Sequence, residues 1–129
     1  MSNLERVDIS DIEQARRFIG DIGCDPNSID IMAPKAVFRT LVVEKVHPVD
    51  AIIIKQDMLS IGGEVAIPRD VFEVKDKECR ILVMGTMRQL EELVRKLYRH
   101  HSRIKGIARE LEDFVKGEYE GAKDRKKDL

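Results

Sequence analysis

The chain has 129 residues, a formal net charge of −1, and 23 basic against 24 acidic side chains. This length suits one domain and excludes a TIM barrel, which needs roughly 250 residues. The balanced charge gives nucleic acid and anionic membranes no overall attraction, and 5% aromatic residues without Trp argue against a base-stacking surface. We therefore expect a globular protein with neither a nucleic-acid nor a membrane partner.

The sequence shows no targeting or membrane-inserting segment. The N-terminus lacks a basic region followed by an apolar one, and apolar runs such as residues 51–54 fall far short of the ~20 residues that span a bilayer. Cys24 and Cys79 lie far apart, without the spacing of a metal site or a disulfide scaffold. These features predict a cytoplasmic protein with two reduced thiols.

The first half of the chain predicts a helix, a strand and a second helix. Ser10 and Glu13 have the spacing of a capping box, and helical apolar spacing follows as far as Gly23, a helix-ending residue. A turn-rich connection over residues 24–34 leads to a β-branched strand over residues 36–44. His47 stands where a helix cap belongs, and Pro48 suits the first position of a helix that ends at residues 62–63.

The second half predicts two strands followed by two helices. A short strand covers residues 64–67, and Cys79 begins a buried strand over residues 79–84. Residues 69–78 suit either a separate strand or a covering loop. Thr86 and Gln89 form a second capping box that opens an amphipathic helix, and a further helix follows residue 102 and ends at Gly117.

Strands that alternate with helices predict an α/β fold. We expect a small three- to four-stranded mixed or parallel sheet covered by helices, with a βαβ core and an extra C-terminal helix. Residues 1–117 would form this single domain. Residues 118–129, which are charged and almost without apolar side chains, are predicted to be a disordered tail.

Two glycine-containing corners are the candidate binding sites. Gly62 and Gly63 permit positive φ and close backbone approach, although a plain helix C-cap followed by a turn is the simpler interpretation. Gly85 and Thr86 leave a strand and enter a helix, where free amides and the helix dipole favour an anion. A purely structural strand-to-helix turn is the alternative there, because no GxGxxG or Walker sequence surrounds it.

Nearby polar residues complete the predicted site. Lys35 and Arg69, each just after a proline, would supply positive charge unless they are ordinary solvated side chains. Gln56 and Gln89 have the amide geometry that pairs with the edge of a heterocycle. The candidate ligand-binding residues are therefore Lys35, Gln56, Ser60, Gly62, Gly63, Arg69, Gly85, Thr86 and Gln89.

No catalytic constellation can be assembled from the sequence. The three histidines, His47, His100 and His101, belong to no HExxH or Cys/His metal pattern, and GxSxG is absent. The carboxylates stand beside Lys and Arg, as on solvated helix faces. We therefore assign no catalytic residue, metal or cofactor and favour a non-enzyme. A small enzyme that uses Gly85 and Thr86 is the least favoured alternative.

Three sequence blocks together resemble a known family. They are GCDP with IMAPKA at residues 23–26 and 31–36, KQDMLSIGGEVA at residues 55–66, and LVMGT with Gln89 at residues 82–89. Over about residues 15–115, they resemble the N-terminal extension of long-form dihydropteroate synthases of some anaerobic bacteria, and related archaeal proteins. In that family the synthase reaction belongs to a barrel whose pterin-binding Asp, Asn and Lys motifs have no counterpart here.

The resemblance implies a role in pterin biosynthesis, for folate or methanopterin, without the catalytic barrel. We expect a non-catalytic α/β module that binds a pterin-like or phosphorylated small molecule or docks on a synthase. The alternative is a structural homodimer without a small-molecule ligand, formed through apolar surface on the helix that contains residues 52–54 or on the C-terminal helices.

Overall fold

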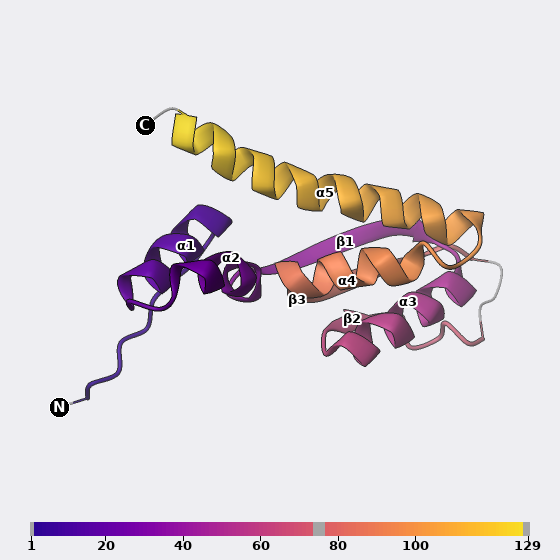
Figure 1. Ribbon diagram of the computed structural model, residues 1–129. Helices are drawn as coiled ribbons and strands as arrows, with labels where there is room; N and C mark the ends of the chain where they lie inside the picture. The colour runs from indigo at the N-terminus through magenta and orange to yellow at the C-terminus, as the bar shows by residue number, and fades with distance from the viewer. Residues whose placement is uncertain (1, 74–76, 128–129) are drawn as a thin grey trace.

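The computed structural model describes residues 2–73 and 77–127, with side chains as far as residue 121. In these ranges a small sheet is packed against helices, and an N-terminal helical segment lies at one end (Figure 1). The N-terminal segment contains α1 (Ile12–Asp21) and α2 (Ile29–Met32), with 3₁₀ turns at Pro26–Ser28 and Ala33–Lys35. The remaining elements are β1 (Phe38–Val46), α3 (Pro48–Ile61), β2 (Glu64–Ala66), β3 (Cys79–Thr86), α4 (Met87–Leu97) and α5 (Ser102–Lys127).

The sheet has three strands in the order β1-β3-β2, and both outer strands run antiparallel to β3. Phe38 lies opposite Thr86, and Val65 lies opposite Val83. The α/β class, the small sheet and the C-terminal helix are confirmed, but the expected parallel or mixed pairing is wrong. β1 and β2, which α3 connects, run in the same direction, yet β3 returns between them. The βαβ unit is therefore split.

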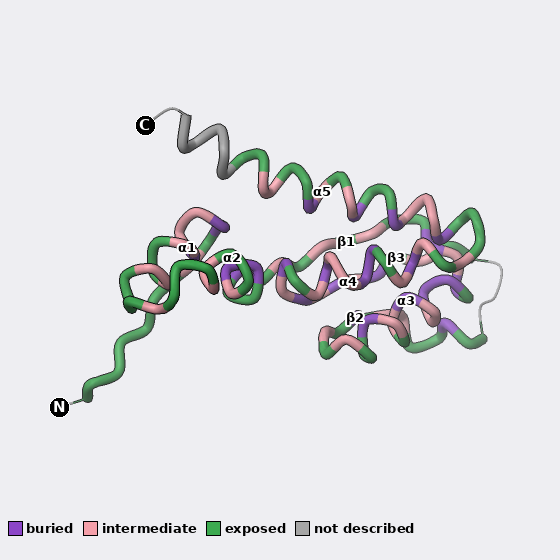
Figure 2. Tube along the Cα trace, viewed as in Figure 1, coloured by how far each residue is buried: buried purple, intermediate pink, exposed green. Residues whose placement is uncertain are grey.

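The hydrophobic core lies between the sheet and α3 and α4, with α5 packed along α4 (Figures 1 and 2). Alternation along β3 directs Ile81 and Val83 into this core, while Leu82 and Met84 are only partly buried on the other face. Phe38 and Val42 of β1 share that second face and are more than half exposed, at 56% and 51%. One face of the sheet therefore carries the core, and the other carries exposed apolar side chains.

Side chains cap the helices close to the predicted positions. α3 begins after His47, whose Nδ1 accepts a hydrogen bond from the Val49 amide at 3.2 Å, and it ends at Gly62, where φ is 100°. The Thr86–Gln89 capping box is present. The first box is wrong by one residue, because Asp11 caps α1 by accepting from the Gln14 amide at 2.8 Å. Ser10 instead hydrogen-bonds the Gln14 side chain.

Two connections differ from each other in how they match the prediction: residues 24–34 contain helix, and the described residues of 69–78 contain no strand. The segment over residues 24–34 includes α2 and most of the two 3₁₀ turns. Residues 69–73 form turns that bury Val71, as the covering-loop alternative requires, and residues 77–78 show no strand either. Residues 74–76 lie outside the described part of the chain.

The predicted helix end at Gly117 is wrong, because α5 continues to Lys127. Glu118 forms an ion pair with Arg39 of β1 at 3.0 Å, and the Tyr119 hydroxyl donates a hydrogen bond to Glu91 of α4. These contacts hold the helix beyond the glycine, and the Glu, Lys, Ala and Arg residues that follow favour a helix. The predicted tail thus begins within α5, and residues 128–129 lie outside the description.

Cys24 and Cys79 are both free thiols, and each is partly buried. Burial raises the pKa of the Cys79 thiol, which also donates a hydrogen bond to the Val46 carbonyl at 3.3 Å. Among the described residues, no helix combines the length and apolar character needed to cross a membrane.

Candidate functional site

The two predicted glycine corners meet in the structure. A Cβ added to Gly62 would lie 3.4 Å from Nε2 of Gln89, and one added to Gly85 would lie 3.0 Å from its Oε1. Gly63 and Gly85 both pack against the buried Met58, whose Cε would lie 2.5 Å and 2.3 Å from their respective added Cβ atoms. We call this arrangement of Met58, Gly62, Gly63, Gly85 and Gln89 the glycine corner.

The glycine corner has a structural explanation, since three backbone amides at the adjoining strand-to-helix turn are engaged within the protein. The Met87 amide donates to the Val37 carbonyl at 2.8 Å, and the Gln89 amide donates to Thr86 Oγ1 at 3.1 Å. The Gln89 side chain in turn accepts from the Thr86 amide at 2.9 Å. Three donors that an anion would need are thus taken, and the glycines make room for Met58. A ligand at this corner remains a prediction.

The other predicted site residues lie around the corner or away from it. Ser60 faces α4, where its hydroxyl accepts a hydrogen bond from Lys96 at 2.9 Å, and Gln56 is exposed on α3. Arg69 follows β2, which runs toward the start of β3, so it lies at the opposite end of that strand from Gly85. Lys35 lies on the α4 side of the N-terminal segment, in a separate pocket.

That pocket has a volume of about 360 Å³ and is formed where α2 and the turn after it meet α4 and α5. We call it the Lys35 pocket. Three separate parts of the chain supply its polar side chains. Its lining residues are Asp30, Ile31, Pro34, Lys35, Arg88, Glu91 and Tyr119.

Of the four charged side chains that line the Lys35 pocket, Lys35 and Glu91 have no ion-pair partner among the described residues. Asp30 is paired with Arg16 at 2.8 Å, and Arg88 is paired with Glu92 at 3.0 Å. Glu91 accepts the hydrogen bond of Tyr119, and burial together with this bond raises the pKa of the tyrosine hydroxyl. Lys35 forms no ion pair with any described residue. Its ammonium group is therefore available to an anion.

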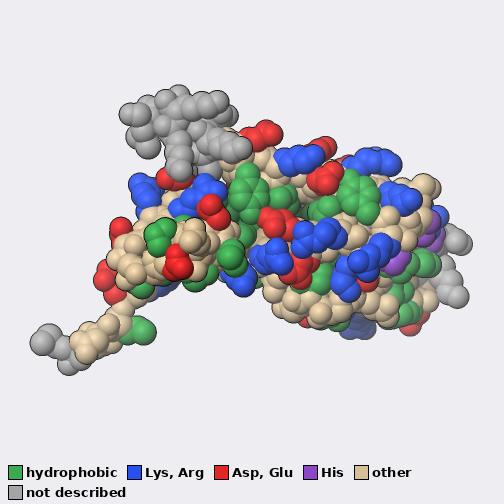
Figure 3. Space-filling view, in the orientation of Figure 1, with side chains coloured by type: hydrophobic (Ala, Val, Ile, Leu, Met, Phe, Trp, Pro, Cys, Tyr) green, Lys and Arg blue, Asp and Glu red, His purple; other side chains and the backbone are tan. Residues whose placement is uncertain are grey.

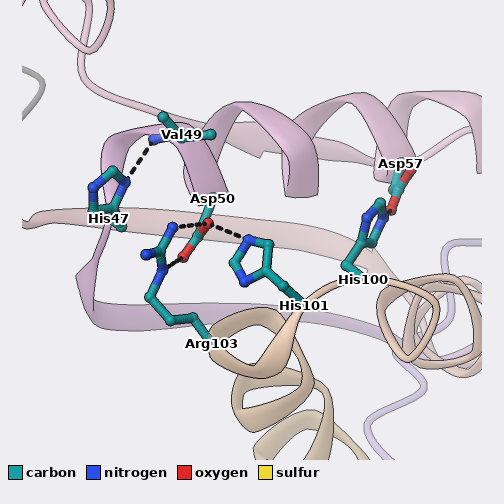
Figure 4. A network of polar contacts seen from close by, with 7 residues as sticks. All are labelled: His47, Val49, Asp50, Asp57, His100, His101 and Arg103. Atoms are coloured by element: carbon teal, nitrogen blue, oxygen red, sulfur yellow. Dashed lines mark hydrogen bonds and ion pairs between the residues drawn. The ribbon is translucent and has the colours of Figure 1, made fainter.

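A second polar cluster lies where the α4–α5 connection meets α3 (Figure 4). The buried Asp50 accepts two hydrogen bonds from the Arg103 guanidinium, at 2.9 and 3.2 Å, and lies 3.1 Å from His101 Nε2. His100 Nε2 lies 2.9 Å from the Asp57 carboxylate. Asp50 raises the pKa of Arg103 through these hydrogen bonds.

This cluster joins helices. Its ion pairs connect α3 to the first turn of α5 and to the residues just before it, and His47 is engaged at the start of α3. In the described ranges no three His, Cys, Asp or Glu residues are placed to hold a metal ion. Lys and Arg are interspersed with Asp and Glu over the face seen in Figure 3, so no single-sign field covers it.

Sequence reasoning missed most of the Lys35 pocket. Arg88 and Glu91 belong to a helix whose inward face alone was singled out, and Tyr119 fell in the predicted tail. The signal for Arg88 was its position inside the Thr86–Gln89 capping box, which places it in the first turn of α4. No local pattern indicates that α5 reaches this pocket.

The chain is similar to a curated protein. Over 95 residues it is 28% identical to a bifunctional dihydropteroate synthase/dihydropteroate reductase from Helicobacter pylori. The match covers 74% of this chain and 25% of that protein, so the chain spans about a quarter of its relative's length. No family model matches the chain, and no solved structure matches it. The similarity supports a distant relation to dihydropteroate synthase-type proteins, as the sequence blocks predicted.

Proposed function

We propose that this chain is a non-catalytic module of pterin biosynthesis, for folate or methanopterin, and that it binds a phosphorylated pterin-like molecule. The observation that carries the proposal is the similarity to the Helicobacter pylori protein, which extends over 74% of this chain. A quarter of that protein aligns with this chain. The three sequence blocks resemble an extension that lies outside the catalytic barrel. The proposal therefore concerns binding and assigns no reaction to the chain.

The Lys35 pocket offers the groups that such a ligand needs. Lys35 and Arg88 would bind a phosphate group through charge-assisted hydrogen bonds. A pterin ring presents N–H donors along one edge, and the Glu91 carboxylate has acceptor positions beyond the one that Tyr119 occupies. A volume of about 360 Å³ lies within the ~300–1,000 Å³ range of small-molecule sites.

Calorimetric titration tests the proposal with three compounds: a pterin pyrophosphate, the same pterin without phosphate, and inorganic pyrophosphate. The phosphorylated pterin should bind best, and Lys35→Ala or Arg88→Ala should weaken it by about tenfold or more, because each removes a charged hydrogen bond. Arg95→Ala is the matched control, since Arg95 is exposed on the same helix and lies outside the pocket. Equal affinity in all four proteins would reject this pocket.

The same similarity also suggests docking on a separate synthase. Sedimentation of the chain mixed with a dihydropteroate synthase tests docking independently of any ligand. A complex that forms without pterin, together with no calorimetric signal for any of the three compounds, would favour docking over ligand binding. Absence of both a complex and ligand binding would contradict the proposed role.

A further inference from the structure

Strand β1 leaves one edge of the sheet open, because the strand order gives it β3 as a neighbour on one side. The Val37 carbonyl accepts a hydrogen bond from Met87, at the end of β3. Backbone groups of successive residues in a strand point to opposite sides, so those of Phe38, Thr40 and Val42 point to the open edge. Consistently, the Phe38 carbonyl accepts from the guanidinium of Arg39 at 3.0 Å.

The residues with edge-facing backbone groups also carry exposed side chains. Phe38 and Val42 are 56% and 51% exposed, Thr40 between them is exposed, and all three lie on the sheet face away from the core. Natural edge strands are usually shielded by proline, by lysine or by a covering element. Over residues 38–43, β1 has neither proline nor lysine. The Arg39 guanidinium binds Glu118 of α5 and the Ser10 carbonyl, and at the open edge it contacts the Phe38 carbonyl.

We propose that β1 pairs antiparallel with β1 of a second copy of this chain, about a two-fold axis at Thr40. Thr40 then lies opposite Thr40 of the second copy, and each Phe38 lies opposite the other copy's Val42. The backbone groups of Thr40 and Val42 point to the open edge, and Arg39 shares or releases the Phe38 carbonyl when that residue pairs. Aromatic–β-branched and Thr–Thr pairs are favourable cross-strand neighbours. The result is one continuous six-stranded sheet, and the proposal is independent of ligand binding.

Charge and polarity favour the register with its two-fold axis at Thr40 over those with the axis at Leu41 or Val42. An axis at Val42 would place Arg39 opposite Lys45 of the second copy, and like charges directly opposite are destabilising. An axis at Leu41 would place Phe38 opposite a Glu44 carboxylate. With the axis at Thr40, the part of β1 that pairs with itself is residues 38–42, where Arg39 lies opposite Leu41 and no two like charges face each other. A two-fold pairing uses the β1 edge of both copies and leaves β2 as the outer strand at each end of the sheet.

Sedimentation equilibrium over a wide concentration range tests the pairing. Wild type should be a dimer that dissociates on dilution. Thr40→Pro should raise the dissociation constant at least tenfold without unfolding the monomer, because the amide it removes points away from β3. Val42→Lys should have the same effect and serves if the proline variant fails to fold. Ala66→Lys, on the same sheet face but on β2, is the matched control and should still dimerise.

Amide hydrogen exchange gives a second measurement. The amides of Phe38, Thr40 and Val42 should become more protected as wild-type concentration rises, and those of Leu41 and Val43 should not change. A monomer at every concentration would overturn the proposal. So would a dimer that persists in both β1 variants, because it would have to use another surface.

Discussion

The Tyr119 hydroxyl of α5 donates a hydrogen bond to the Glu91 carboxylate of α4, two residues beyond Gly117. One residue earlier, Glu118 forms an ion pair with Arg39 of β1. Both contacts exist because α5 runs through the glycine without ending there. The turn of α5 that contains Glu118 and Tyr119 therefore contacts β1 and α4, and Tyr119 lines the Lys35 pocket.

The course of α5 predicts that Gly117→Ala stabilises the protein. Gly117 lies in the helix interior, and an added Cβ would have open space around it. Alanine should raise the free energy of unfolding by about 0.5–1 kcal/mol, because it restricts the unfolded chain and favours a helix. Urea denaturation measures the change, and Gly106→Ala, also in an open position within α5, is the control. A loss of stability at Gly117 alone would mean that the helix ends there.

Tyr119 predicts a dependence of stability on alkaline pH. Burial and the bond to Glu91 raise the pKa of its hydroxyl, so the folded state favours the neutral phenol. The stability from this group is complete below the unfolded pKa of about 10 and is lost as pH rises from there toward the folded pKa. Between pH 9 and 11, wild type should lose more stability than Tyr119→Phe in denaturant titrations. Equal slopes would contradict a raised pKa.

The ion pair of Asp50 and Arg103 predicts a non-additive pair of substitutions. Arg103→Leu leaves the buried carboxylate with His101 alone and should cost about 1–3 kcal/mol of stability. Asp50→Asn should recover part of that loss in the double variant, because no buried charge then remains. Thermal unfolding of all four proteins at one pH measures the coupling. Strictly additive effects would show that the two side chains do not interact.

The glycine corner predicts a packing effect at Gly85. The alanine Cβ would lie 2.3 Å from Cε of Met58, so Gly85→Ala should cost about 1–3 kcal/mol as Met58 is displaced. Met58→Ala alone should cost about 2–5 kcal/mol through the cavity it leaves. The double variant should lose less than the sum of the two. If Gly85→Ala leaves stability unchanged but weakens binding of a phosphorylated pterin, the corner is a ligand site.

Local signals in the sequence predicted the helices and strands. The strand directions and the residues that meet in each pocket depend on contacts between distant parts of the chain. His47, Gly62 and the Thr86–Gln89 box mark helix ends because capping depends on a few neighbouring residues. The direction of β3 depends on its pairing with β1 and β2, which are distant in the sequence, and no local pattern encodes that. The sequence singled out Gly62, Gly63 and Gly85 but did not show that they meet, and it did not connect Tyr119 with Lys35.

The function proposed for this chain requires that it binds a phosphorylated pterin in the Lys35 pocket. The most direct measurement is a titration of the ¹⁵N-labelled protein with a pterin pyrophosphate, followed by amide chemical shifts. We predict saturable shifts confined to residues around Lys35, Arg88 and Tyr119, and their loss in Lys35→Ala. No saturable shift, or shifts confined to the glycine corner and unchanged in Lys35→Ala, would contradict the claim.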